Sequence, residues 1–247
     1  MKLLAFETAT EACSIAVYVD GEVRERFDVA PRRHAELALP WAEALLAEAG
    51  LARSQLDAIA LSRGPGAFTG VRLAIALAQG IALALDRPLV PVSTLAVLAA
   101  QVPPPPVSAG EGGCDVAAPR AILAAIDARM GEIYTGTFVH RGDRLEATSG
   151  EAVVAPADYV LAGDARGWVG VGTGFAASEG VLATRLETRF ARIDAHALPH
   201  ASDLARLAAD AFARGEGIAP EHVEPAYLRN NVALTLDEQK ALRAARS

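Results

Sequence analysis

Two stretches of this chain open in the same way: LLAFETATEACSIAVYVDG at residues 3–21 and AILAAIDARMGEIYTGTFVHRGD at residues 121–143. Each begins with an apolar run that ends in an acid, Glu7 in the first and Asp127 in the second. A polar turn, a β-rich run and a glycine-containing turn follow in both, with Asp20-Gly21 giving a strong hairpin signal. This faint internal repeat predicts a duplicated lobe with an acid at the tip of its first strand, facing a shared cleft.

A proline- and glycine-rich segment separates the two stretches: residues 102–119 read VPPPPVSAGEGGCDVAAP. Four consecutive prolines cannot lie inside a helix or a strand, and the remainder offers little to pack. We therefore expect a first lobe at residues 1–101, a linker or long surface loop at residues 102–119 and a second lobe at residues 120–247.

Helical and strand patterns alternate through the rest of the chain. Apolar strands are expected at residues 58–61 and 89–92, and helices at residues 35–49, 71–85, 94–101 and 203–214. Ser93 and Ser202 are placed to cap the last two of these helices. Strands that alternate with helices predict an α/β fold with helices on the faces of the sheets.

Composition narrows the class of protein. The 247 residues are 52% hydrophobic, which is enough for a real core, but only 5% aromatic, and the net charge is -7. A protein that holds nucleic acid unaided usually shows a basic face, so any RNA should be gripped mostly by another chain. Cys13 and Cys114 form neither a CxxC pair nor a disulfide framework. The N-terminus carries no signal-peptide core and no unbroken apolar run has membrane-spanning length, so we expect a cytoplasmic protein without membrane contact.

The predicted helix at residues 71–85, VRLAIALAQGIALAL, has almost no polar residue. Such a helix is either a core helix buried on every side or a helix with one face on the sheet and the other on a partner chain. The helix at residues 35–49 is also rich in Ala and Leu, so the two could form a helix-on-helix seam. The candidate interface residues are Leu37, Trp41, Leu45, Leu73, Leu77 and Ile81.

Two glycine-rich loops resemble phosphate cradles. In SRGPGAFTGVR (residues 62–72) the glycines allow close backbone approach and Thr69 offers a hydroxyl at the start of a helix, where free N–H groups suit an anion. GVGTG at residues 170–174 follows a strand in the same manner. The competing interpretation of both is a tight turn that needs glycine. The candidate phosphate contacts are Thr8, Thr10, Gly64, Gly66, Thr69, Gly70, Gly172 and Gly174.

A metal site is not favoured by the histidines. His196 and His200 have the spacing of a helical metal pair, but Pro199 lies between them and the glutamate of an HExxH motif is absent. No Ser/His/Asp or Cys/His arrangement follows from spacing either. We expect neither a metal nor a catalytic residue in this chain.

Six stretches, in order, carry a resemblance to a known family: ETATEACS, RGPGAFTGVRLA, PVSTL, AAIDARMGEIY, VGTG and EPAYLRNNVA. Together they closely resemble the TsaB family, bacterial members of the actin-like superfamily with a duplicated ribonuclease-H-like fold. The match spans nearly the whole chain except residues 102–119 and the tail after Val232. The resemblance therefore implies a two-lobed, duplicated ribonuclease-H-like α/β fold.

The resemblance also implies a function. TsaB proteins take part in making threonylcarbamoyladenosine in tRNAs that read codons starting with adenine. They pair with the catalytic paralogue TsaD, the ATPase TsaE joins that complex, and TsaB alone can self-associate. This implies a non-catalytic scaffold that needs no cofactor itself, with ATP or ADP only at the level of the complex and tRNA only through it. The alternatives are an ATP-dependent kinase or transferase of the same superfamily and, disfavoured, a metallopeptidase.

Comparison with TsaD implies why this chain lacks a catalytic metal site. TsaD carries a metal-binding HxxxH motif just after a strand that ends in Pro-Val, and here Thr94 and Leu98 occupy the two histidine positions. Leucine has no donor atom, so that metal site cannot form. Glu7 departs from the Asp that usually ends the first strand of the family. Asp127 and Arg129 match the family without a defined chemical role, and no role follows from the sequence for Glu132.

Overall fold

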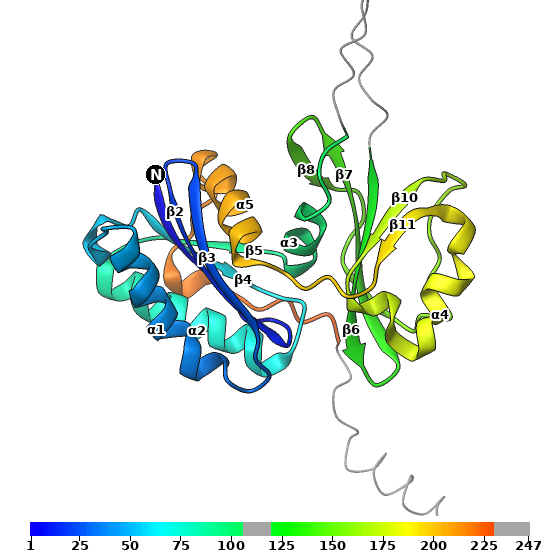
Figure 1. Ribbon diagram of the computed structural model, residues 1–247, viewed down its shortest axis with the longest axis horizontal. Helices are drawn as coiled ribbons and strands as arrows, with labels where there is room; N and C mark the ends of the chain where they lie inside the picture. Colours follow the sequence, from blue (N-terminus) through cyan, green and yellow to red (C-terminus); the bar gives the residue numbers. More distant parts are fainter. Residues whose placement is uncertain (106–119, 230–247) are drawn as a thin grey trace, which may run out of the picture.

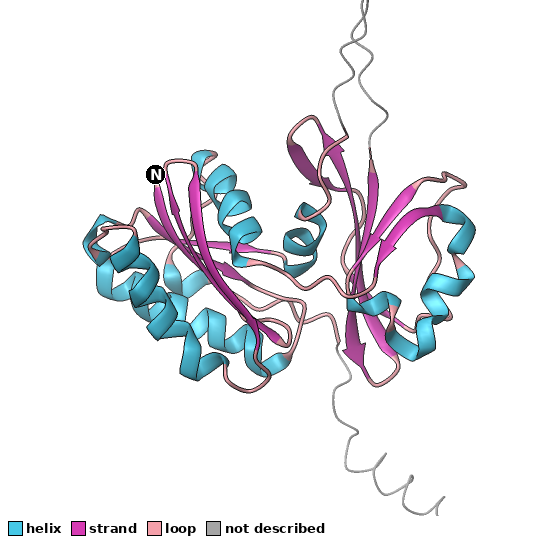
Figure 2. Ribbon diagram, viewed as in Figure 1, coloured by secondary structure: helices cyan, strands magenta, loops and turns pink. Residues whose placement is uncertain are grey.

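The computed structural model describes residues 1–105 and 120–229, and it consists of two β-sheets with helices against their faces (Figures 1 and 2). Most of the predicted linker, Cys114 and the tail lie outside the described residues. The first sheet has the order β3-β2-β1-β4-β5. Its strands are β1 (Lys2–Glu7), β2 (Ala12–Val19), β3 (Glu22–Val29), β4 (Ala58–Ser62) and β5 (Leu89–Val92).

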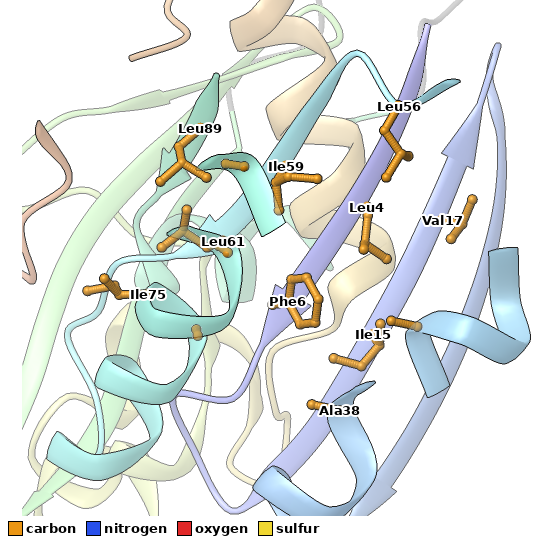
Figure 3. Packing of buried hydrophobic residues seen from close by; sticks show 14 of the residues in the cluster. Leu4, Phe6, Ile15, Val17, Ala38, Leu56, Ile59, Leu61, Ile75 and Leu89 are labelled. Atoms are coloured by element: carbon orange, nitrogen blue, oxygen red, sulfur yellow. The ribbon is translucent and has the colours of Figure 1, made fainter. Parts of the chain in front are cut away.

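Alternation along β1 divides the first lobe into two cores. Leu4 and Phe6 face helices α1 (His34–Glu48) and α2 (Phe68–Leu85), as Figure 3 shows. Leu3 and Ala5 point to the opposite face, because successive side chains of a strand alternate between the faces of a sheet. Both faces of the central strand are therefore covered, which explains why β1 reads as a continuous apolar run.

The second sheet repeats the antiparallel opening of the first. Its order is β11-β10-β6-β7-β8, with β9 also paired to β7. The strands are β6 (Ala121–Arg129), β7 (Glu132–Arg141), β8 (Arg144–Ala147), β9 (Ala152–Val154), β10 (Trp168–Val171) and β11 (Phe190–Asp194). In each sheet a central strand pairs antiparallel with the strand that follows it and parallel with a later one. The predicted duplication and α/β class are confirmed.

Two helices cross between the lobes, and the predicted lobe boundaries are wrong for them. Helix α3 (Thr94–Ala100) precedes the linker but packs on the second sheet through Leu95 and Leu98. Helix α5 (Ala201–Ala213) follows the second sheet but packs on the first. The sheet face under α5 is rich in alanine, including Ala5, Ala16 and Ala60. Small side chains on both surfaces let α5 pack closely there.

Most predicted element ends agree with the structure. Ser93 caps α3 by accepting hydrogen bonds from the backbone N–H groups of Leu95 and Ala96. The predicted cap at Ser202 is wrong, because α5 begins at Ala201 and His200 occupies the N-cap position. The remaining helices are α4 (Ala177–Arg185) and short 3-10 turns at Arg53–Gln55, Thr173–Phe175, Glu187–Arg189 and Pro220–His222.

Helix α2 is apolar on its buried side and along most of its exposed side, with the exposed polar residues Thr69 and Arg72 near its start. Its eighteen residues have a mean hydropathy of 1.7, so by length and composition alone it could cross a membrane, contrary to the expectation that no run would qualify. Only 33% of it is buried, through a face that includes Val71, Ala74 and Ile75. The interpretation as a helix buried on every side is therefore wrong.

Candidate functional site

The acid at the end of β1 is sealed inside the first lobe. Glu7 is fully buried, its carboxylate accepts a hydrogen bond from the backbone N–H of Ala9 at 2.8 Å, and the Ser62 hydroxyl donates to its other oxygen. Burial raises the pKa of Glu7 to about 7, although these two hydrogen bonds oppose the shift. The expectation of an acid facing a cleft is wrong for Glu7, because its carboxyl group has no contact with solvent.

The RGPGAFTG loop packs directly on the turn after β1. A Cβ atom on Gly70 would lie 1.9 Å from the carbonyl oxygen of Thr8, and one on Gly66 would lie 2.3 Å from that of Ala9. The backbone N–H of Ala67 donates to the Ala9 carbonyl at 2.7 Å. Close backbone packing therefore explains these glycines without any anion.

The two predicted threonine contacts of that turn already have partners within the protein. The Thr8 hydroxyl donates to the carbonyl of Gly70 at 2.7 Å, and the Thr10 hydroxyl accepts from the N–H of Ala12 at 3.3 Å. Thr69 is exposed at the start of α2. Phosphate binding by the first loop stays a prediction. Of the three threonines, Thr69 has the side chain that is most accessible to a ligand.

The GVGTG loop packs in the same manner on the second sheet. Gly172 has a φ of 112°, and a Cβ atom there would lie 2.3 Å from both the Ala125 carbonyl oxygen and the Leu98 side chain. A Cβ on Gly174 would lie 2.7 Å from the Cβ of Ala125. The glycines bring this loop against β6, so the turn interpretation accounts for both.

A pocket of about 660 Å³ opens between the two lobes. It brings together the turn after β1, the starts of α1 and α2, the β6–β7 turn and the C-terminal segment at residues 225–229. Of the predicted phosphate contacts, Thr10, Gly66, Thr69 and Gly70 line it; Thr8, Gly64, Gly172 and Gly174 do not. Its volume falls in the range of small-molecule sites.

The β6–β7 turn at the pocket is shaped by Asp127. The Asp127 carboxylate accepts hydrogen bonds from the backbone N–H and the guanidinium of Arg129, both at 2.8 Å. The backbone N–H of Asp127 donates to the Thr173 hydroxyl. Arg129 and Met130 have positive φ values of 63° and 56°. Asp127 thus stabilises a tight turn of unusual backbone geometry.

The segment at residues 223–229 joins the lobes, and sequence reasoning assigned it no role. Val223 is buried in the first core, and the N–H of Ala226 donates to the carbonyl of Arg63 at 2.8 Å. At the other end, Arg229 donates to the carbonyl of Ala128 at 3.1 Å and to the carboxylate of Glu132. Glu132 therefore anchors the C-terminal segment to the second lobe.

A second polar cluster fixes the start of α5 on the first sheet. Glu25 accepts hydrogen bonds from the Ser14 hydroxyl at 2.6 Å and the Ser202 N–H at 3.1 Å, and its carboxylate pairs with His200 at 3.1 Å. The hydrogen bond to Glu25 raises the pKa of His200. His196 and His200 belong to no cluster of three or more His, Cys, Asp or Glu side chains that could hold a metal among the described residues.

Comparisons with known proteins agree with this architecture. A family model described as TsaD, tRNA N6-adenosine threonylcarbamoyltransferase, matches residues 28–235. The chain is 38% identical to the tRNA threonylcarbamoyladenosine biosynthesis protein TsaB of Escherichia coli, over 94% of this chain and 96% of that one. The corresponding protein of Haemophilus influenzae is 33% identical, with 94% and 95% covered.

The chain belongs to the TsaB family. A solved structure described as YeaZ from Pseudomonas aeruginosa is also similar, with a TM-score of 0.79 and 43% identity over 92% of this chain and 99% of that one. The family places this chain in the biosynthesis of tRNA threonylcarbamoyladenosine.

In this TsaB-family chain, protein atoms fill the region where the resemblance to TsaD would place a metal motif. Thr94 and Leu98 are both fully buried, and Leu98 belongs to the core under the second sheet. Within the described residues, the Thr94 hydroxyl has no hydrogen-bond partner. The side chains at the two histidine positions therefore pack in the interior.

The predicted partner residues do not share one environment. Leu45 is only 1% exposed, so it belongs to the core, and the prediction that it lies in a partner interface is wrong. The other five (Leu37, Trp41, Leu73, Leu77 and Ile81) are half-buried. Sequence reasoning missed the more exposed Leu39 on α1 and Leu83 on α2, at 43% and 65%.

We define the exposed α2 face as Leu73, Ala76, Leu77, Gly80, Leu83 and Ala84. Their spacing of three or four residues places them along one side of the helix. None carries a polar side chain, and α1 lies beside α2 on the same side of the sheet (Figure 1). Contiguous exposed apolar surface of this kind is typical of a protein–protein contact.

Proposed function

We propose that this chain is the non-catalytic scaffold subunit that acts with TsaD and TsaE in threonylcarbamoylation of the adenosine next to the anticodon, in tRNAs that read codons starting with adenine. The observation that carries the proposal is the exposed α2 face, which is apolar from Leu73 to Ala84 and which the rest of the described chain leaves partly exposed. Membership in the TsaB family supports the pathway.

The scaffold role is supported by the surroundings of the two acids and of the two positions that correspond to the TsaD histidines. Glu7 is buried, Asp127 is bonded to Arg129, and the two positions that correspond to the TsaD histidines pack in a core. A catalytic acid or base must reach the proton that it transfers, and the buried Glu7 carboxyl group cannot do so. We propose that the chemistry belongs to TsaD and that this chain needs no cofactor of its own.

The exposed α2 face is the proposed contact for TsaD and, in the absence of TsaD, for a second copy of this chain. Leu83→Glu places a charge on this face without touching the core, whereas Leu77 and Ile81 also pack against the core and would confuse association with folding. Co-elution with TsaD in size-exclusion chromatography should be lost in Leu83→Glu and retained in Val160→Glu, which changes an exposed residue of the other lobe. Equal co-elution of the two variants would exclude this surface.

Reconstitution of the tRNA modification reaction distinguishes a scaffold role from an enzymatic role for this chain. Modification of tRNA by TsaD and TsaE should require this chain, and the isolated chain should transfer nothing. Calorimetry of the isolated chain with ATP and magnesium tests the alternative, an ATP-dependent kinase or transferase. Binding accompanied by turnover would overturn the scaffold proposal.

A further inference from the structure

Two aromatic rings and an arginine form an exposed stack at the mouth of the interlobe pocket. Phe68 is 59% exposed at the start of α2, and Tyr227 is 55% exposed on the C-terminal segment. The Arg72 guanidinium lies 3.6 Å above the centre of the Phe68 ring and donates to the Tyr227 hydroxyl at 2.7 and 2.9 Å. Elements more than 150 residues apart in sequence thus meet at one surface, where the Phe68 and Tyr227 rings are tilted by 33° with their centroids 6.4 Å apart.

The two aromatic rings of the stack present apolar area to solvent. Large aromatic side chains are normally buried, and this chain has few of them. The described residues offer Arg72 the neutral Tyr227 hydroxyl rather than a carboxylate, so its charge is not compensated by an ion pair there. Both aromatic rings also line the pocket.

The charge around the stack is opposite in sign to that of the whole chain. The pocket is lined by Arg32, Arg129 and Arg229 against only two acids, Glu11 and Asp127. Arg72 at the mouth adds a fourth cation, whereas Glu132 outside the lining pairs with Arg229. The complete chain carries -7. Arg129 pairs with Asp127 and Arg229 with Glu132, so the surplus rests on Arg32 and Arg72 against Glu11. This local cationic surplus beside an exposed ring suits an anionic ligand with a flat aromatic group.

We infer that Phe68, Arg72 and Tyr227 form a stacking site for an unpaired base of single-stranded RNA, and that this chain therefore touches the tRNA directly. Unpaired bases stack on aromatic rings and on arginine planes, while Arg32 and Arg72, which form no ion pair with another described residue, attract the phosphates. The local charge favours RNA at the stack. The exposed α2 face proposed for TsaD begins at Leu73, next to Arg72 at the pocket, and extends from there to Ala84. The inference rests on the proposed role in tRNA modification, and it amends the expectation that tRNA is held only through the complex.

The test uses the full chain and a fluorescein-labelled RNA hairpin with a single-stranded loop of anticodon size, followed by fluorescence anisotropy. Phe68→Ala should weaken binding by roughly 5- to 150-fold, the loss expected for one base–aromatic stack. Phe68→Tyr should retain binding, and Arg72→Ala should weaken it and reduce its salt dependence. Val160→Ala and Arg166→Ala, exposed changes in the other lobe, are the matched controls and should bind as the wild type does. A photoreactive uridine in the loop should cross-link to the peptide that contains Phe68 or Tyr227.

Several outcomes would overturn the inference. The wild-type chain could fail to bind the hairpin, or Phe68→Ala could bind it like the controls. Complete displacement of the hairpin by free AMP would assign the site to a free nucleotide. Loss of TsaD co-elution in Phe68→Ala, with RNA affinity unchanged, would assign the stack to protein docking. Each of these results leaves the scaffold proposal standing, because that proposal is tested by the need for this chain in the reconstituted reaction.

Discussion

Single residues at the end of β1 show how the protein interior affects the ionisation of an acid and the choice of residues in the adjoining loop. Glu7 has a carboxyl group in a solvent-free site whose hydrogen bonds only partly offset the cost of holding a charge there. The neighbouring glycines of the RGPGAFTG loop are required because Thr8 and Ala9 already occupy the space that a Cβ atom would need. The turn, the acid and the loop therefore form one packed unit.

Burial of Glu7 predicts a pH-dependent stability. Its pKa is about 7 in the folded chain and 4.5 unfolded, so the unfolded state loses its proton first and stability falls as pH rises from about 4.5 to 7. The loss should be roughly 3 kcal/mol in the free energy of unfolding. Urea unfolding of the wild type and Glu7→Gln at pH 5 and pH 8 measures it. The prediction fails if the substitution leaves the pH dependence unchanged.

The close contact at Gly70 predicts a large effect of one methyl group. Gly70→Ala should destabilise the chain by about 3 kcal/mol or more, because a Cβ atom would overlap the Thr8 carbonyl. Gly80→Ala on the same helix meets nothing within 4 Å and should stabilise by up to about 1 kcal/mol. Thermal unfolding at one protein concentration compares the two. Similar melting temperatures would contradict the packing explanation.

Among the elements, α5 is the one whose position depends most on a polar anchor. Its sequence neighbours belong to the second lobe, yet it packs on the first sheet. Alanine-rich packing surfaces do not specify the position of a helix along its axis strongly, whereas the bonds of Glu25 to Ser14, His200 and Ser202 do. Burial acts to raise the pKa of Glu25, but its hydrogen bonds with His200 and Ser14 lower it overall, so the anchor is ionised at neutral pH.

Removing this charge should loosen the start of α5. Glu25→Gln is expected to cost about 1 to 3 kcal/mol, because the charge-assisted hydrogen bonds are lost. Hydrogen exchange should accelerate at the amides of Ala201 and Ser202 while β1 stays protected. Glu22→Gln, an exposed change on the same strand, is the control. Unchanged exchange at α5 would show that packing alone positions the helix.

At the scale of the whole molecule, the lobes are tied together by exchanged helices and by the C-terminal segment. Helix α3 crosses in one direction and α5 in the other. The segment at residues 223–229 then runs from one lobe to the other and lines the interlobe pocket, anchored by Val223 at one end and by Arg229 at the other. These connections link the elements that form the interlobe pocket, the stack at its mouth and the exposed α2 face.

The bond between Arg229 and Glu132 should contribute measurably to this connection. Glu132 is 37% exposed, so solvent screening keeps the expected coupling energy at about 1 kcal/mol. A double-mutant cycle with Arg229→Ala and Glu132→Ala, followed by urea unfolding, measures it. The exposed pair Arg214 and Glu216, two residues apart in the chain, should show no measurable coupling. Additive effects of the two changes at the anchor would contradict its role.

The sequence alone determined the local structure and the family. Apolar runs, hairpin turns and the Ser93 cap follow from side-chain periodicity and backbone chemistry, which act over a few residues. Only the tertiary structure decided which lobe α3 and α5 join, that Glu7 and Leu45 are buried, and that one side of α2 stays exposed. It also brought Phe68, Arg72 and Tyr227 together. These outcomes depend on contacts between distant segments, and local pattern carries no information about which surfaces meet.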